Sequence, residues 1–271
     1  MRHLDDELPR FVAAANDRGH RADICVWDDP AIDWNSYDSV VVRSCWDYTG
    51  RREEFVAWAR SIPSLHNPAD VIAWNTDKVY LREFAKSGTP VIDTYWDVQR
   101  DDDIGEHSEW VCKPSISAGS RDTARWSSRE EVYAHSAALV AAGRTSMVQP
   151  YVQSVDTDGE TAMIFLGGEF SHAIRKSQLL HKGEGADVDR NGRETITPRA
   201  PTAAQHEVAA ESLAVVSRIL SLNEPLLYAR VDLVTASDGS PLVIELELTE
   251  PSLFLAHSED SAGILIRALD S

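Results

Sequence analysis

The sequence predicts a mixed α/β (α+β) fold, and three features of the chain lead to this expectation. Helix and strand patterns alternate in the first quarter of the chain, which is typical of a small parallel α/β unit. Pairs of strands joined by short turns, at Gly167-Gly168 and Asp238-Gly239, follow later and are typical of antiparallel hairpins. The chain has 271 residues, close to the length at which a single core divides into domains.

The composition is that of a globular chain with an acidic excess. Hydrophobic residues make up 43% of the sequence and the formal net charge is −18, so nucleic acid is not expected as a partner. No apolar run reaches the roughly 20 residues that span a bilayer, and the first residues lack a signal-peptide core. The wide spacing of Cys25, Cys45 and Cys112 indicates neither a zinc site nor disulfides, and Cys45 and Cys112, in or beside apolar runs, are expected to be buried thiols. We therefore expect a cytoplasmic protein without a membrane partner.

The first unit is predicted to be a small parallel α/β arrangement. Its expected elements are a helix over 8–18 that ends at Gly19, strands over 22–27 and 39–43, and a helix over 51–61. Units of this kind usually begin with a strand. No strand pattern precedes the first helix, so we expect this unit to lack its first strand.

The rest of the chain combines further helices with short strands. We expect helices over 70–87, 129–142 and 202–220, and strands over 91–95, 110–113 and 146–152. Hairpin strands are expected over 161–166 and 170–175, and again over 226–234 and 242–248. The segment 178–201 is polar and contains glycines, and we interpret it as a functional loop in which residues 182–193 form a lid.

Acidic residues recur in the last predicted hairpin at the spacing of a strand face. Arg230 and Asp232 are two residues apart on one strand, as are Glu245 and Glu247 on the other. Carboxylates about 4 Å apart repel by about 4 kcal/mol per pair at an effective dielectric of about 20, and Arg230 alone does not balance three of them. Oxygen-only ligands suit Mg2+ or Mn2+, so we interpret Asp232, Glu245 and Glu247 as metal ligands. A solvated polar strand face is the alternative.

Two lysines stand at places suited to an anionic ligand. Lys78 lies in the helix predicted over 70–87, and Lys113 ends an apolar strand, where a surface charge is not expected. The small-residue loop after Lys113, which includes Ser117, can bring backbone N–H groups close to phosphates. The patterns GxxxxGK[ST] and GxGxxG are absent. Taken singly, Lys78 is equally an ordinary surface lysine and Lys113 an ordinary strand end, but together with the carboxylates they favour nucleotide binding.

The order of these features resembles the ATP-grasp family. The matching elements over residues 70–256 are Lys78, Val111-Cys112-Lys113-Pro114, Val148-Gln149-Pro150-Tyr151-Val152, Arg230-Val231-Asp232 and Glu245-Leu246-Glu247. Segments 43–48, 74–78, 171–176 and 245–254 resemble the glutathione-synthetase-like branch, which includes the O-ureido-serine cyclo-ligase of cycloserine biosynthesis. The resemblance implies an ATP-grasp fold in which two α+β subdomains, 69–152 and 153–271, clasp ATP behind a pre-ATP-grasp α/β domain over 1–68.

The resemblance also implies roles for individual residues. The implied ATP-binding residues are Lys78, Lys113, Ser117, Gln149, Pro150, Tyr151, Val152 and Glu160. Arg230, with Arg175 or Lys176, would stabilise the transferred phosphoryl group, and Asp232, Glu245 and Glu247 would hold Mg2+ or Mn2+. The family commonly has Asn where Glu247 stands, so this metal site carries an additional negative charge.

The sequence therefore predicts an ATP-dependent ligase that joins a small, amino-acid-like carboxylate to an amine through an acyl phosphate and releases ADP and phosphate. The substrate-binding candidates are Arg43, Trp46, Asp47, His172 and Glu250. A packing corner with a structural Arg–Asp pair explains segment 43–48 almost as well, and a hairpin cap explains His172 equally. A small-molecule kinase and a non-catalytic nucleotide-binding protein are the alternatives for the whole chain. Intramolecular and intermolecular ligation, and a monomer and a homodimer, remain open.

Overall fold

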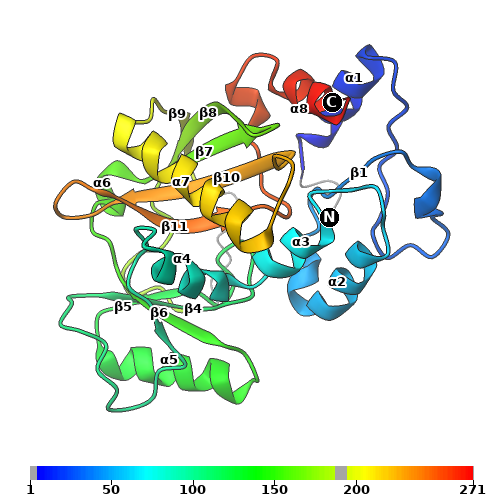
Figure 1. Cartoon of the computed structure of the whole chain (residues 1–271). Coiled ribbons are helices and arrows are strands. Elements are labelled where there is room, and N and C mark those ends of the chain that lie inside the picture. Colours follow the sequence, from blue (N-terminus) through cyan, green and yellow to red (C-terminus); the bar gives the residue numbers. More distant parts are fainter. Residues whose placement is uncertain (1–4, 187–193, 271) are drawn as a thin grey trace.

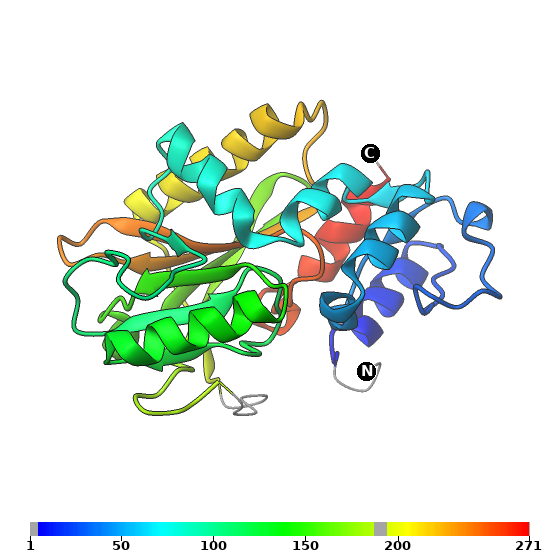
Figure 2. The same ribbon diagram turned by 90° about the horizontal axis from the view of Figure 1, so that it is seen from below.

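Two antiparallel sheets form most of the molecule. The computed structural model describes residues 5–186 and 194–270. A five-stranded sheet in the order β11-β10-β7-β8-β9 and a four-stranded sheet in the order β3-β6-β4-β5 lie next to each other (Figure 1). A small parallel sheet belongs to the N-terminal part, which lies at one end of the molecule (Figure 2). The predicted mixed α/β class is confirmed.

The N-terminal part contains a parallel strand pair, as expected. Its elements are α1 (Leu8–Asp17), η2 (Trp34–Ser36), β1 (Val40–Val41), η3 (Trp46–Gly50), α2 (Arg52–Arg60) and β2 (Leu65–His66). The strand predicted over 22–27 is wrong, because these residues pair with no strand in the part of the chain that the structure describes. Ile24 and Val26 are exposed, and Trp27 packs against the rings of Phe55 and Trp58. Side-chain packing holds this segment where a β-ladder was expected.

Helix α1 packs against α8 (Ser261–Leu269), although the two helices are at opposite ends of the sequence (Figure 1). Phe11 of α1 joins a buried cluster that includes Leu253, Leu255 and Leu265. Arg18 Nη2 lies 2.7 Å from Asp270 Oδ2. The first helix is therefore attached to the C-terminal part of the chain.

The central part carries the four-stranded sheet. Its elements are α3 (Ala69–Asn75), η4 (Lys78–Tyr80), α4 (Leu81–Ser87), β3 (Tyr95–Trp96), β4 (Trp110–Pro114), β5 (Ala124–Trp126), α5 (Arg129–Ala141) and β6 (Ser146–Pro150). Helix α5 lies along one face of this sheet (Figure 2). The strand predicted over 91–95 is largely wrong, since only Tyr95 belongs to β3, while Val91 forms an isolated bridge with Val243.

The helix predicted over 70–87 is interrupted after α3, which is a correction with a structural cause. Asp77 has an extended backbone (φ −130°) and its side chain accepts a hydrogen bond from the Val79 N–H. The Lys78 N–H donates to the Ser115 carbonyl at 2.9 Å. A contact with a distant loop thus replaces an intrahelical hydrogen bond.

The C-terminal part carries the five-stranded sheet. Its elements are α6 (Val155–Asp158), β7 (Glu160–Leu166), β8 (Glu169–Lys176), β9 (Ile196–Pro198), α7 (Ala203–Leu220), β10 (Tyr228–Thr235), β11 (Pro241–Glu247), η5 (Leu255–His257) and α8. Both predicted hairpins are confirmed, as β7 pairs with β8 and β10 with β11. Helix α7 lies across one face of this sheet (Figure 1).

The main core joins the two sheets. Val231, Leu233 and Leu246 are almost fully buried and cluster with Phe84 of α4 and Met147 of β6. Because strand side chains alternate between faces, the polar residues between these apolar ones are directed to the other side of β10 and β11. Packing of the apolar face thus fixes where the carboxylates lie.

The segment predicted as a functional loop, 178–201, is partly a strand. Its residues Ile196–Pro198 form β9 and pair with β8. Residues 187–193 of the predicted lid lie outside the described residues. Among the helices that the structure describes, none combines the length and apolar character needed to cross a bilayer.

Candidate active site

The carboxylates of the last hairpin lie side by side on β10 and β11. Arg230 is opposite Glu247, and Asp232 is opposite Glu245, in the antiparallel register. A bulge follows Asp232, because Leu233 pairs with Val243 and one residue of β11 is passed over. The side chain of Asp232 is 1% exposed, whereas those of Glu245 and Glu247 keep 28% and 29% exposure. The spacing in the sequence therefore does gather these residues.

Arg230 is held from several sides. Its Nε and Nη2 donate to the two oxygens of Asp232 at 2.8 and 3.0 Å, and Nη2 also donates to Glu247 Oε1. Its Nη1 donates to the Ser252 carbonyl at 3.0 Å, and the guanidinium lies 5.5 Å from the centroid of the Phe254 ring. Burial opposes its charge, but Asp232 and Glu247 outweigh burial and raise its pKa. Arg230 is therefore a permanently charged hydrogen-bond donor whose orientation is set by these contacts.

Lys176 approaches the same carboxylates from β8. Its Nζ lies 2.8 Å from Asp232 Oδ2 and 2.7 Å from Glu160 Oε2. Burial alone lowers the pKa of this amine, but Asp232 and Glu160 raise it well above its ordinary value. The site thus holds a second fixed cation, which the family resemblance had implied as an alternative to Arg175.

The open edge of β11 is covered by side chains of the central part. Asn75 Nδ2 donates to the Leu246 carbonyl and its Oδ1 accepts from the Leu248 N–H, both at 2.7 Å. The Tyr80 hydroxyl donates to the Leu246 carbonyl at 3.0 Å and accepts from the Leu246 N–H at 2.8 Å. Buried strand-edge groups need such partners. These bonds fix η4 against β11 and so bring Lys78 to the carboxylates.

Lys78 and Lys113 lie on the side of the central part that faces β11. Lys78 Nζ is 3.1 Å from Glu245 Oε1 and donates to the Ser117 carbonyl at 2.8 Å. Lys113 is 8% exposed, and burial, with the nearby charge of Lys78, lowers its pKa. No carboxylate of the described residues forms an ion pair with Lys113. Its ammonium group is therefore available to an anionic ligand.

The acidic residues differ in their tendency to ionise. Burial raises the pKa of Asp232, but Arg230 and Lys176 outweigh it and lower the value to about 2. Burial also opposes ionisation of Glu245, and Lys78 and Lys113 lower its pKa. Burial raises the pKa of Glu247 to about 7, with Arg230 opposing and Glu245 adding to the shift. Of these three carboxyl groups, Glu247 is therefore the one whose ionisation is opposed most by its surroundings.

The donor set suits a hard divalent cation, but the side chains do not converge. Asp232, Glu245 and Glu247 offer only oxygen atoms, which are the ligands that hard divalent cations prefer. Within the described residues, no three acidic, histidine or cysteine side chains come close enough together to hold a metal ion. Both oxygens of Asp232 are engaged by Arg230 and Lys176, and Glu245 faces Lys78. The residues therefore fit a divalent cation by the chemistry of their donor atoms and not by their present arrangement.

The segment predicted to meet adenine runs from β6 towards α6. Gln149 is 3% exposed within β6. The Arg125 guanidinium lies 3.5 Å from the centroid of the Tyr151 ring, and the Tyr151 hydroxyl donates to Asp156 Oδ1 at 2.5 Å. Arg125 also forms a 2.8 Å ion pair with Asp156. Half-buried residues of the same segment are Pro150 and Val152. These contacts hold the Tyr151 side chain in place. Contact between this segment and adenine stays a prediction.

Two residues predicted for the site are engaged elsewhere. The side chain of Arg175 lies on the opposite face of β8 from that of Lys176. Its Nε and Nη2 donate to the carbonyls of Asp158 and Thr157 at 2.8 and 2.9 Å. His172 Nε2 is 3.0 Å from the Leu253 carbonyl, and its Nδ1 is 3.0 Å from Ser171 Oγ. Arg175 is therefore not beside the carboxylates, and both ring nitrogens of His172 already have protein partners.

Segment 43–48 forms different pairs from those weighed in the sequence. Arg43 Nη2 lies 2.7 Å from Glu7 Oε2, whereas Asp47 accepts from Trp27 Nε1 at 3.2 Å. A structural Arg43–Asp47 pair is therefore wrong. Nε and Nη1 of Arg43 are buried and have no hydrogen-bond partner in the part of the chain that the structure describes. Half-buried Trp46 begins η3.

Glu250 lies buried just beyond β11. It is 8% exposed, and burial together with the charge of Glu247 raises its pKa to about 8. The hydroxyl of Tyr48, itself 5% exposed, hydrogen-bonds to it and partly offsets that shift. Two of the substrate-binding candidates are therefore buried groups with unusual surroundings. The pKa of Glu250 is raised, and two guanidinium nitrogens of Arg43 lack hydrogen-bond partners among the described residues.

Sequence reasoning assigned no role to Glu7, Tyr48 or Tyr80. Tyr80 lies in an ordinary helical pattern, and Glu7 lies at a helix start, where acidic residues are common. Their partners are far away in the sequence, so no local spacing indicated them. Asn75 was recognised only as part of segment 74–78.

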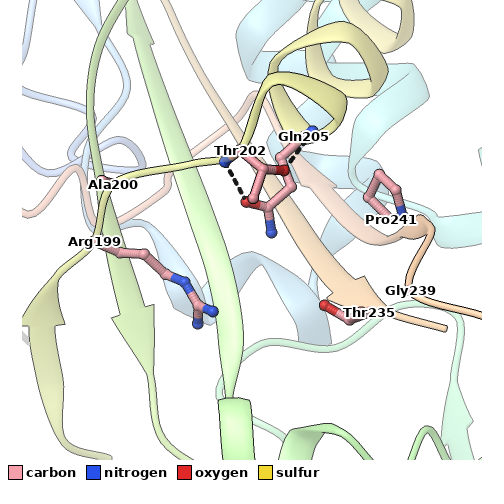
Figure 3. Close-up of a pocket in the computed structure, with 7 residues that line it drawn as sticks. All are labelled: Arg199, Ala200, Thr202, Gln205, Thr235, Gly239 and Pro241. Carbon is pink, nitrogen blue, oxygen red and sulfur yellow. Dashed lines mark hydrogen bonds between the residues drawn. The ribbon is translucent and has the colours of Figure 1, made fainter. Parts of the chain in front are cut away.

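Two hollows lie away from this site. One of about 150 Å³ lies at the start of α7, where Figure 3 shows the reciprocal hydrogen bonds between Thr202 and Gln205 that cap the helix, with Arg199 nearby. A second of about 330 Å³ lies beside the later part of α7. None of the predicted site residues lines either hollow.

Comparisons with known proteins give a relative that matches almost the whole chain. Cycloserine biosynthesis protein DcsG of Streptomyces lavendulae is 36% identical over 285 residues, which covers 98% of this chain and 93% of the relative. The chain belongs to the DcsG family of ATP-grasp ligases. A family model described as the N-terminal domain of D-cycloserine synthetase DcsG matches residues 1–68.

Solved structures of the DcsG family and of more distant ligases share the fold. The crystal structure of D-cycloserine synthetase DcsG matches with a TM-score of 0.89 at 36% identity, covering 98% of this chain and 94% of that one. The ATP-grasp ligase PsnB, with its minimal precursor, matches with a TM-score of 0.64 at 16% identity, covering 98% and 95%. D-alanine–D-alanine ligase from Bacillus anthracis, complexed with ATP, matches with a TM-score of 0.60 at 15% identity, covering 98% and 92%. This DcsG-family chain is an ATP-dependent ligase that forms C–N bonds.

Proposed function

We propose that this enzyme activates the carboxylate of an amino-acid-like substrate as an acyl phosphate and closes it onto a nitrogen of the same molecule. The relatives named for cycloserine biosynthesis, at 36% identity over 98% of the chain, support a cyclising ligase. The substrate class that we infer is O-ureido-serine, with a cycloserine-type ring as the product. Residues 1–68, 69–152 and 153–271 are the proposed functional divisions of the chain.

The observation that carries this proposal is the gathering of cations around the carboxylates of β10 and β11. Arg230 and Lys176 contact Asp232, Lys78 contacts Glu245, and the buried Lys113 completes the group. Fixed positive charges in a partly buried site suit a triphosphate and the charge that develops when its terminal phosphoryl group is transferred.

The proposed metal ligands are Asp232, Glu245 and Glu247, which would hold Mg2+ or Mn2+ together with the nucleotide. When bound, a divalent cation neutralises negative charge on the phosphates. In that state Lys78 and Lys176 would exchange their carboxylate partners for phosphate oxygens. Gln149 and Tyr151 would contact the base, and Glu160 would border the nucleotide.

The chemical steps follow from the groups that the chain holds in place. A carboxylate oxygen of the substrate attacks the γ-phosphorus, the bond to the β,γ-bridging oxygen breaks, and ADP leaves. The substrate nitrogen bound to the serine oxygen then attacks the acyl carbon and loses its proton to solvent, and phosphate leaves with the former carboxylate oxygen. The ring nitrogen keeps its carbamoyl group until water cleaves that group off as carbon dioxide and ammonia. Arg230 and Lys176 stabilise the phosphoryl group with charges that are already oriented.

Arg43 supports the placement of the substrate carboxylate. Its Nε and Nη1 are buried and lack hydrogen-bond partners among the described residues, and such donors are costly unless a ligand satisfies them. Glu250, with a pKa of about 8, would face the substrate nitrogen. Both residues lie outside the phosphate-binding group and so suit the organic substrate.

The test is ADP release by the whole enzyme with ATP, Mg2+ and O-ureido-serine of either configuration, against a panel of amino acids offered singly and in pairs. We expect ADP release with O-ureido-serine alone and a cyclic product by mass spectrometry. A phosphorylated substrate that accumulates without ring closure would show a kinase. The absence of ADP release with every substrate would overturn the ligase proposal.

A further inference from the structure

The segment that follows β11 lies directly against Arg230. The Ser252 carbonyl accepts from Arg230 Nη1 at 3.0 Å, and the Phe254 ring stacks near the same guanidinium. Phe254 has a left-handed backbone (φ 51°), which a residue with a bulky side chain rarely adopts. The contacts of residues 249–255 must therefore hold this conformation.

Glu7 makes the charged contact that holds this segment. Its Oε2 accepts from the Leu253 N–H at 2.8 Å and its Oε1 accepts from the Leu255 N–H at 2.7 Å. Oε2 also accepts from Arg43 Nη2 at 2.7 Å. The side chain is 10% exposed. Hydrogen bonds from a buried carboxylate to backbone N–H groups are among the strong ones in proteins.

The helix that carries Glu7 is itself anchored to the same part of the molecule. Phe11 packs with Leu253 and Leu255 in one buried cluster, and the end of α1 is tied to Asp270 through Arg18. On the opposite side of the segment, His172 Nε2 lies 3.0 Å from the Leu253 carbonyl. Glu7 and His172 thus both form hydrogen bonds to the backbone of residues 253–255, from different parts of the chain.

We propose that Glu7 is a positioning residue for ligation. Through residues 249–255 it sets the orientation of Arg230 beside the phosphoryl group, and through its ion pair it sets Arg43 beside the substrate. This inference rests on the proposed ligase function. It gives a role in catalysis to a residue of the first helix that contacts neither of the lysines assigned to the phosphates.

The consequence is a specific kind of defect when Glu7 is altered. When Arg230 and Arg43 are misplaced, ATP can still bind through Lys78 and Lys113. The two arginines no longer hold the activated carboxylate and its phosphoryl group in line with the substrate nitrogen, so water competes for the acyl phosphate. Misplacement of reacting groups by about 1 Å costs about 100-fold in rate.

The experiment compares Glu7→Gln with Asp6→Asn in the full-length enzyme. Asp6 is the exposed neighbour of Glu7, so the control removes the same charge without touching residues 249–255. The amide of Gln cannot accept from both backbone N–H groups and from Arg43 together. Measured quantities are the melting temperature, kcat and KM for each substrate, and the ratio of ADP released to cyclic product formed.

For Glu7→Gln we expect kcat/KM for the organic substrate to fall about 10- to 100-fold, KM for ATP to stay close to wild type, and the ratio of ADP to product to rise. Asp6→Asn should match wild type in every quantity. A Glu7→Gln enzyme that folds and keeps the wild-type ratio and KM values would overturn the inference, because it would make Glu7 merely structural.

A second variant covers the case in which Glu7→Gln does not fold. Glu7→Asp keeps the charge at the start of α1 but is one methylene shorter, so it cannot reach all three donors. We expect it to fold and to raise the ratio of ADP to product. A wild-type ratio in Glu7→Asp would contradict the inference. Failure of the proposed function is a separate result, since the wild-type enzyme itself would then release no ADP.

Discussion

Arg230 shares its guanidinium among Asp232, Glu247 and the Ser252 carbonyl, and Lys176 shares its ammonium between Asp232 and Glu160. Each contact restricts the direction in which positive charge is presented. Charges that are oriented before the reaction need little reorganisation in the transition state, which is where electrostatic catalysis gains most. In the proposed function, this orientation suits Arg230 and Lys176 to a bound polyanion.

Glu245→Gln tests the contribution of a single carboxylate. Glu245 holds Lys78 at 3.1 Å and is a proposed metal ligand. Loss of its charge should lower ADP release by about 100-fold or more, while the circular dichroism spectrum stays that of the wild type. Glu224→Gln, at an exposed position, is the control. Wild-type ADP release by Glu245→Gln would refute the assigned role.

The pH dependence of stability tests the burial of Glu250. Its pKa rises from 4.5 to about 8 on folding, so the folded state binds the proton more tightly than the unfolded state. The contribution of this protonated carboxyl group to the free energy of unfolding is fully present below the pKa of the unfolded state. It is lost as the pH rises through about 8.

In urea denaturation of the nucleotide-free protein, the free energy of unfolding should therefore fall between about pH 4.5 and 8, and it should fall less in Glu250→Gln. Equal pH slopes in wild type and Glu250→Gln would show that Glu250 ionises normally. Glu224→Gln again serves as the exposed control.

At the scale of elements, the interrupted helix between α3 and α4 positions Lys78. Asn75 and Tyr80 form hydrogen bonds to backbone groups at the edge of β11. The residues between them leave the helical conformation, so that the Lys78 N–H donates to the Ser115 carbonyl. A continuous helix would bury these edge groups without partners. The break in the helix is therefore part of how the central part docks on the carboxylate hairpin.

Tyr80→Phe tests this docking. The change removes one hydroxyl that bonds to both the N–H and the carbonyl of Leu246. Asn75 still donates to the carbonyl, but leaving the buried N–H unsatisfied costs about 1–3 kcal/mol. We expect a loss of stability of that size in urea denaturation and a raised KM for ATP, because Lys78 shifts. Tyr133→Phe, whose hydroxyl donates to the exposed Asp102 carbonyl, should change neither.

The elements differ in how far the sequence alone predicts them. Alternating apolar residues in β10 and β11 predict both strands and their polar face, since local spacing determines them. The strand expected over 22–27 fails because pairing depends on a neighbour, and no described strand is its partner. The break at Asp77 and the contacts of Glu7 depend on residues distant in the sequence, which no local pattern reveals.

At the scale of the whole molecule, the site lies where elements from separate parts of the chain meet. Strand β8 brings Lys176, β10 and β11 bring the carboxylates, and η4 and β4 bring Lys78 and Lys113. The sequence order of these residues resembled the ATP-grasp family, and the fold places most of them together. Arg175 and His172 are the exceptions, because their side chains bond to backbone carbonyls elsewhere.

The most direct test of the account is the fate of the substrate carboxylate oxygens. The enzyme is incubated with ATP, Mg2+ and substrate labelled with oxygen-18 in its carboxylate, and the released phosphate is analysed by mass spectrometry. Activation as an acyl phosphate predicts one labelled oxygen in each phosphate that accompanies product. Phosphate that carries no label while product forms would contradict the account, because ATP would then be cleaved without activating the carboxylate.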